Sequence, residues 1–224
     1  MMFGSNWIGR RILWVLSIGL WAASGAQALP VLSEVYYDAP GSDDGLSFVE
    51  LAGVPGTSLE GYALDGINGS NGQVGPTILL AGEIAADGLF VVADRLADGT
   101  TSVVGADFLA NFDFQNGPDS VVLRFGETVL DALGYGDFSP EEFFAGEGNA
   151  APDVVAGSSL ARVFADLDSD DNRSDFIELT MPTPGQASFA PVPEPGTALL
   201  MGLGLLGLGA AGGENRTVRT RRSG

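Results

Sequence analysis

The stretch Ser120-Val121-Val122-Leu123-Arg124-Phe125-Gly126-Glu127-Thr128-Val129-Leu130-Asp131-Ala132-Leu133 decides the fold of this chain. Its first half alternates, which predicts a strand with Val121, Leu123 and Phe125 on one face and with Val122 and Arg124 on the other. A tight Gly-Glu turn then leads into a second apolar run of similar length. The stretch therefore predicts a β-hairpin.

Similar short apolar or alternating runs recur on both sides of this hairpin, and clusters of Gly, Asp, Asn and Pro separate them. Strands are predicted at Val31 to Tyr37, Phe48 to Leu51, Leu59 to Leu64, Thr77 to Leu80, Leu89 to Ala93, Ser120 to Phe125, Thr128 to Leu133, Ser159 to Phe164 and Phe176 to Thr180. Short helices are expected only at Pro140 to Ala145 and Asp107 to Phe112. Such a chain is typical of an all-β sandwich or barrel.

The composition excludes several classes of site. Among its 224 residues the chain has no Cys, His or Lys, and 29 acidic residues face 10 arginines, for a formal charge of −19. Without Cys and His there is no disulfide framework, thiolate zinc site, Ser-His-Asp triad or Cys-His dyad. Any metal would be a hard cation bound by oxygen. The negative charge also repels phosphate backbones, so nucleic acid is not an expected partner.

The N-terminus has the three parts of a secretory signal peptide. Arg10 and Arg11 precede an apolar run from Ile12 to Ala23, and small residues, Ala26 and Ala28, occupy the −3 and −1 positions of a cleavage site. Residues 1–28 are therefore predicted to direct export and to be removed after Ala28.

The C-terminus also has a tripartite pattern. Pro193-Glu194-Pro195 precedes an uncharged segment rich in Leu, Gly and Ala at about residues 196–213, and an Arg-rich tail follows. The segment is marginally long enough to cross a bilayer as a helix, and the arginines would keep its end in the cytoplasm. The body of the protein would then lie outside the inner membrane.

Residues 192–224 resemble, part for part, the PEP-CTERM sorting signal of Gram-negative bacteria. The resemblance implies an inner-membrane precursor that is recognised by an exosortase and cleaved near the Pro-Glu-Pro. It also implies a mature protein at the cell surface or in the extracellular matrix, where extracellular polysaccharide or an envelope protein would be its partner.

Residues 29–191 remain as the body, 163 residues with 27 acidic residues and four arginines, or a formal charge of −23. That length suits a single domain. Neighbouring Tyr36 and Tyr37 must face opposite sides of a strand, so we expect one of them to be exposed.

The body resembles the lamin-tail domain in its bacterial secreted form, an immunoglobulin-like β-sandwich. The residues that carry the resemblance are Leu32 to Asp38, Gly41 to Gly45, Phe48 to Leu51, Leu59 to Tyr62, Leu89 to Ala93, Gly117 to Leu123, Ser159 to Arg162, Asp175-Phe176 and Thr183 to Gly185. The resemblance implies a binding or targeting module. It names no ligand, because fold alone does not supply a function.

A candidate calcium loop lies near the end of the body. Asp166, Asp168, Asp170 and Asn172 occupy positions 1, 3, 5 and 7 of a twelve-residue calcium loop. Position 6, however, is Asp171 where such loops have Gly, and position 12 is Ile177, one residue before Glu178. Possible calcium binding therefore competes with an ordinary solvated acidic turn, and no other cofactor is expected.

Other carboxylates form further candidate sites. Asp38, Asp43 and Asp44 could hold a cation opposite Glu50, but ordinary Asp-Gly turn chemistry explains them better. As acid-base pairs for glycoside hydrolysis, the candidates are Glu141 with Glu142 and Glu34 with Glu50. Nothing in the sequence sets either pair in an apolar environment that would raise a pKa.

These observations predict a secreted, non-catalytic surface or matrix-associated protein that binds another component or plays a structural part. Two alternatives are a calcium-stabilised adhesion module, which would depend on the Asp166 to Asn172 loop, and a carboxylate-dependent hydrolase of matrix glycans.

Overall fold

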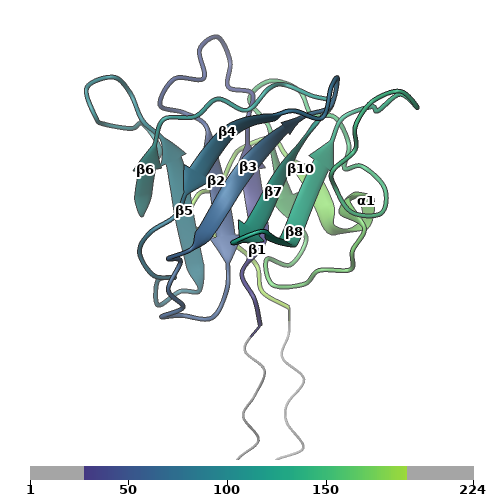
Figure 1. Cartoon of the computed structure of the whole chain (residues 1–224). Helices are drawn as coiled ribbons and strands as arrows, with labels where there is room; N and C mark the ends of the chain where they lie inside the picture. Colours follow the sequence, from purple (N-terminus) through teal and green to yellow (C-terminus); the bar gives the residue numbers. More distant parts are fainter. Residues whose placement is uncertain (1–27, 191–224) are drawn as a thin grey trace, which may run out of the picture.

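The computed structural model describes residues 28–190, and these form two β-sheets. The first sheet has six strands in the order β10 (Phe176–Leu179), β9 (Ser159–Arg162), β1 (Val31–Tyr36), β2 (Phe48–Ala52), β5 (Leu89–Asp94) and β6 (Phe108–Ala110). The second has four, in the order β4 (Val74–Leu79), β3 (Tyr62–Asn68), β7 (Asp119–Phe125) and β8 (Thr128–Tyr135). All neighbours are antiparallel except β5 and β6 (Figure 1). The expected all-β class is confirmed.

The predicted hairpin is β7 and β8. Its register pairs Phe125 with Thr128 and Val121 with Leu133, and Val121 and Leu123 are fully buried. Phe125 ends β7, and 51% of it is exposed. The register shift in this hairpin lies in β8, where Leu130 is skipped, whereas β7 pairs with β3 without a break. Phe125 therefore keeps the face of Leu123, and its ring packs edge-on against Tyr62, its partner in β3.

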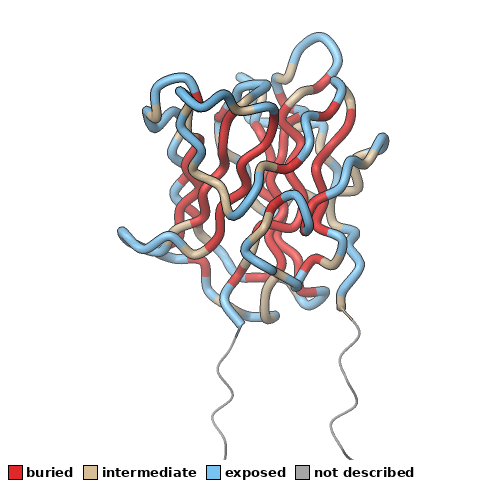
Figure 2. Tube along the Cα trace, turned by 90° about the vertical axis from the view of Figure 1, so that its right-hand side faces the viewer, coloured by how far each residue is buried: buried red, intermediate tan, exposed pale blue. Residues whose placement is uncertain are grey.

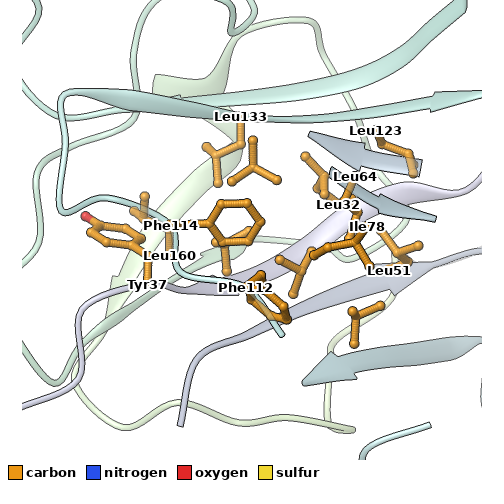
Figure 3. Packing of buried hydrophobic residues seen from close by; sticks show 14 of the residues in the cluster. Leu32, Tyr37, Leu51, Leu64, Ile78, Phe112, Phe114, Leu123, Leu133 and Leu160 are labelled. Carbon is orange, nitrogen blue, oxygen red and sulfur yellow. The ribbon is translucent and has the colours of Figure 1, made fainter. Parts of the chain in front are cut away.

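The main core lies between the two sheets. Figure 3 shows leucines of the six-stranded sheet facing leucines of the four-stranded sheet, with Phe112 and Phe114 beside them. Burial follows the strands and exposure follows the loops (Figure 2). Removing this apolar surface from water is the main favourable contribution to folding, about 25 cal/mol for each Å².

The outer face of the six-stranded sheet carries a second apolar cluster. Tyr36, Phe48 and Val91 are buried there beneath Val103 and Ala106 of the β5–β6 connection. The expectation that Tyr36 or Tyr37 is exposed is therefore wrong. On the other side of the strand, Tyr37 is fully buried and stacks on Tyr135, with 4.1 Å between the ring centroids.

Neither predicted helix forms. Residues 107–112 contain β6, and residues 140–145 form turns and bends. The helix among the described residues is the single turn α1 (Asn172–Asp175). Within residues 28–190, no helix is long and apolar enough to cross a membrane; the segment predicted at 196–213 and nearly all of the predicted signal peptide lie outside these residues.

Both ends of the described chain leave the domain at the same end (Figure 1). Leu29 and Phe189 line one apolar cavity there, together with Val31. We call this end the proximal pole. From it β1 rises for six residues, about 20 Å at strand spacing, so that Tyr37 and its stacking partner Tyr135 lie toward the opposite end, the distal pole.

Candidate functional site

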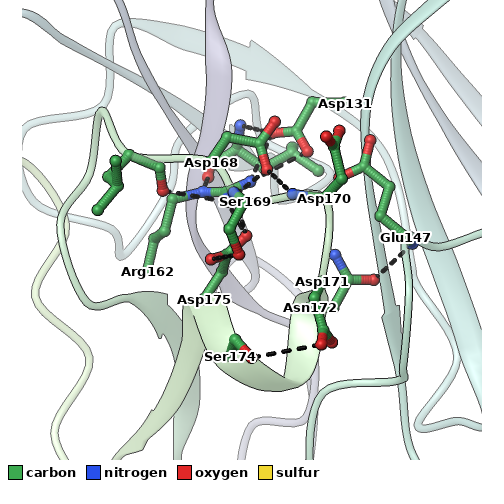
Figure 4. Close-up of polar contacts among 12 residues, drawn as sticks. Asp131, Glu147, Arg162, Asp168, Ser169, Asp170, Asp171, Asn172, Ser174 and Asp175 are labelled. Atoms are coloured by element: carbon green, nitrogen blue, oxygen red, sulfur yellow. Dashed lines mark hydrogen bonds and ion pairs between the residues drawn. The ribbon is translucent and has the colours of Figure 1, made fainter.

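The densest polar cluster surrounds the buried guanidinium of Arg162, at the end of β9 (Figure 4). Its Nη2 donates to both carboxylate oxygens of Asp131, at 3.0 and 2.9 Å, and its Nη1 donates to Asp175 at 2.8 Å and Asp168 at 3.1 Å. Its Nε donates to the carbonyl oxygen of Leu32 at 2.8 Å. The side chains of Arg162 and Asp131 are fully buried.

This cluster connects the two sheets. Arg162 and Leu32 belong to the six-stranded sheet and Asp131 to the four-stranded sheet. The Leu32 backbone N–H also donates to Asp131, at 2.6 Å. Because a buried charge is costly unless it is paired and hydrogen-bonded, each partner depends on the others.

The segment from Ala165 to Asp175 wraps around this cluster through its own acidic residues. Asp175 accepts hydrogen bonds from the Ser169 backbone N–H and hydroxyl, at 3.0 and 2.6 Å. Asp171 caps α1 by accepting from the Arg173 N–H. Asp170 has a positive φ of 56°, a conformation that Asp tolerates better than most residues. The Asp-rich sequence thus specifies a tight turn.

Asn172 fastens this loop to β8. It is fully buried, its Oδ1 accepts from the backbone N–H groups of Gly134 and Glu147, and its Nδ2 donates to the Ala132 carbonyl. A Cβ on Gly146 would overlap Asn172 Oδ1 and the Gly134 backbone nitrogen. A glycine is therefore required at position 146 for the close approach.

The four residues of the predicted calcium loop have different contacts. Asp168 lies in the Arg162 cluster, and the Asp168 carboxylate accepts from the backbone N–H of Asp170 at 3.1 Å. Asp166 instead accepts from the Ala190 N–H near the proximal pole, and both ends of the Asn172 amide bond to β8 and Glu147. The structure therefore separates Asp166 and Asn172 from the carboxylates around Arg162.

A different acidic group comes together here. One oxygen each of Asp131, Glu147 and Asp168 lie within 4.8 Å of one another. The Glu147 Oε2 atom is enclosed and has no hydrogen-bond partner among the described residues. Burial, followed by the nearby carboxylates of Asp131, Asp168 and Asp170, raises the pKa of Glu147 to about 8.

Sequence reasoning missed Asp131, Glu147 and Arg162. Asp131 could have been found from the sequence, because it lies two residues before Leu133 and so shares the core-facing side of the strand. A buried carboxylate needs a partner there. The body has four arginines, one of which had to supply that partner. Glu147 could not have been found in this way, because its place depends on how a long connection folds back onto Asn172.

Three of the four carboxylates considered for hydrolysis, those of Glu34, Glu50 and Glu142, have structural contacts. Glu34 accepts from Ser159 and from Thr183, and Glu50 accepts from Ser33 at 2.6 Å and the Gly185 N–H at 2.7 Å. These bonds fix the turn after β10 against β1 and β2. The Glu142 carboxylate accepts from the Ser139 N–H in a local turn.

The second acidic loop is held in the same way. Asp43 accepts from the Ala39 N–H at 2.7 Å, and the Asn116 side chain donates to Asp38 at 3.2 Å. No hydrogen bond from a described residue reaches the Asp44 side chain.

Comparison with known proteins bears on the tail. Residues 191–216 match the model of the PEP-CTERM protein-sorting motif, which confirms that resemblance and includes Pro193, Glu194 and Pro195. The motif implies export, processing by an exosortase and sorting to the cell envelope or surface. No curated protein and no solved structure matches the chain, so the lamin-tail resemblance stays a prediction.

We predict that Arg162→Met lowers the free energy of unfolding by about 3 to 5 kcal/mol, because it leaves Asp131 and Asp175 buried without their cation. Urea unfolding measures the change. Arg124→Met is the matched control, since its ion pair with Asp65 is partly exposed and such pairs contribute about 1 kcal/mol or less. Equal losses in the two variants would contradict this interpretation.

The pKa of Glu147 predicts how stability depends on pH. The folded protein holds a proton on Glu147 up to about pH 8, whereas the unfolded chain releases it near its ordinary pKa of about 4.3. This contribution to stability is therefore complete below about pH 4 and is lost as the pH rises to about 8. In the presence of chelator, the thermal unfolding midpoint should fall less steeply with rising pH in Glu147→Gln than in the wild type. Glu60→Gln, at an exposed position, should leave the steepness unchanged. Identical slopes in all three proteins would refute the assignment.

Proposed function

We propose that this is an exported, non-catalytic protein of a Gram-negative envelope, which an exosortase delivers to the cell surface or extracellular matrix to bind another component or to play a structural part. The match of residues 191–216 to the sorting motif carries the proposal. The body is then a lamin-tail-type, immunoglobulin-like sandwich behind a signal peptide cleaved after Ala28, and its mature partners are extracellular polysaccharide or an envelope protein.

The geometry of the chain ends supports this proposal. Leu29 and Phe189 lie together at the proximal pole (Figure 1), so the export signal and the sorting tail both attach to one end of the domain. While the tail holds the precursor in the membrane, the proximal pole faces the bilayer. The loops of the distal pole then face outward and are free to meet a partner.

The non-catalytic role is favoured because Glu34 and Glu50, one of the candidate acid-base pairs, have other contacts. Glu34 and Glu50 lie opposite each other in β1 and β2, and each accepts hydrogen bonds that hold the Thr183 to Gly185 turn. A general acid must exchange its proton with a substrate. The carboxylates of Glu34 and Glu50 instead form structural hydrogen bonds.

Intact mass measures the processing of the tail. Protein isolated from the native envelope or medium should lack roughly its last 30 residues, because cleavage near Pro193-Glu194-Pro195 removes the apolar segment and the arginines. Glu194→Ala should retain them, whereas Glu178→Ala, at an exposed position of β10, should be processed normally. A wild-type protein with residues through Gly224 still attached would overturn the proposal.

A second candidate is a calcium-stabilised adhesion module, favoured by the Asp131, Glu147 and Asp168 oxygens. Calcium binds oxygens at about 2.3 to 2.6 Å, so two of its ligands lie at most about 5 Å apart. The three oxygens meet that condition. The enclosed Oε2 of Glu147, which lacks a partner among the described residues, is the observation that points to a ligand.

Thermal unfolding of the mature protein in calcium and in chelator tests this candidate. A hundredfold excess of calcium over its Kd would stabilise the fold by about 2.7 kcal/mol, a shift of several degrees. Glu147→Gln should abolish the shift, and Asp166→Asn should keep it, because Asp166 contacts Ala190 instead. Without a shift in the wild type, the cluster would be an acidic shell around Arg162 only.

A further inference from the structure

A cavity of about 230 Å³ opens at the distal pole, between the ends of three strands of the four-stranded sheet and the segment 113–115. Asn68 ends β3, Asp119 begins β7 and Tyr135 ends β8, and the sheet register places these three residues side by side. Tyr135 stacks on Tyr37, which follows β1. The cavity therefore lies at the end of the domain away from Leu29 and Phe189, and we call it the distal pocket.

The segment 113–115 is held rigidly over the pocket. The Tyr135 hydroxyl donates to the Gln115 carbonyl at 2.7 Å, and the Asn68 side chain donates to Gln115 Oε1 at 2.7 Å. Phe114, the residue before Gln115, is buried, and a Cβ on Gly66 would meet its ring at 2.8 Å. Gly66 thus allows Phe114 to pack against β3, and the polar neighbours of Phe114 face outward.

The polar groups of the pocket retain unused hydrogen-bonding capacity. Because Gln115 Oε1 is the acceptor for Asn68, its amide nitrogen points both donors elsewhere. The side chains of Gln73 and Asp113 are exposed and make no hydrogen bond to another described residue. Asp119 receives one bond, from the Gly69 N–H to Oδ1, and its Oδ2 remains available. Both donors and acceptors therefore line one opening.

The charge and the apolar lining narrow the ligand class. Two carboxylates and no cationic side chain line the pocket, so an anionic ligand would be repelled. Ile67, Val74, Pro76 and Phe114 add apolar surface beside the amides. Hydroxyl groups can both donate and accept, and a sugar ring combines several of them with apolar C–H faces, which matches this mixture.

We propose that the distal pocket binds an uncharged sugar unit of a polysaccharide. Asp113 and Asp119 would accept hydrogen bonds from its hydroxyls, and the amides of Gln73 and Gln115 would donate to them. The volume, smaller than that of pockets which enclose drug-sized ligands, suits one ring of a longer chain that continues into solvent. This inference rests on the proposed function and deepens it by naming the component that is bound.

Affinity electrophoresis of the mature protein through gels that contain dextran, laminarin or galactomannan provides the test, with polygalacturonate as an anionic probe and chelator throughout. We expect retardation by at least one neutral polymer and none by polygalacturonate. Asp113→Ala should weaken binding about tenfold or more, since a hydrogen bond to a charged group contributes about 1.5 to 3 kcal/mol. Gln73→Ala should weaken it less, by about twofold to tenfold, since a hydrogen bond between neutral groups contributes about 0.5 to 1.5 kcal/mol. The matched controls are Glu60→Ala, at the proximal end of β3, and Gln186→Ala, outside the pocket, and both should bind like the wild type.

Lack of retardation by all three neutral polymers, equal loss in the controls, or retardation by polygalacturonate alone would overturn the inference. These results are separable from those for the sorting tail. A tail that is removed from a protein without sugar binding refutes the pocket assignment only. A tail that stays attached to a protein with pocket-dependent binding refutes the sorting proposal only.

Discussion

The buried contact between Arg162 and Asp131 is the constraint on which the rest of the domain depends. It joins β9 of one sheet to β8 of the other, and Asp131 also receives the Leu32 N–H. The same guanidinium holds Asp168 and Asp175, and so fixes the loop before β10. Its face lies over the Phe176 ring, 4.5 Å from the centroid, which adds a cation–π contact.

The strong acidity of the body explains why one arginine has so many partners. With a formal charge of −23 on residues 29–191, carboxylates repel one another wherever loops converge. Arg162 offsets three of them at once. Glu147 approaches the same group without such a partner, and burial, followed by the carboxylates that surround it, raises its pKa. The candidate cation site and the structural ion cluster thus share the carboxylates of Asp131 and Asp168.

Periodicity in the sequence predicted the local structure, and long-range packing decided the rest. The β7–β8 hairpin follows from alternation and a tight turn. Phe125 keeps its predicted face but is half exposed at the end of β7, and Tyr36 is buried because a distant connection covers it. Of the predicted calcium residues, Asp168 reaches the cluster, whereas Asp166 and Asn172 are drawn to Ala190 and β8. No local pattern encodes these contacts, since they join residues far apart in the sequence.

The two poles of the domain separate its proposed tasks, with the sorting tail at one and the distal pocket at the other, and this division depends on a rigid connection between the sheets. A double-mutant cycle of Arg162→Met and Asp131→Asn, followed by urea unfolding, tests that connection most directly. The account predicts that the double variant is more stable than the sum of the single losses allows, by about 1 kcal/mol or more. Losses that add within about 0.5 kcal/mol would show that the two residues act independently and would contradict the account.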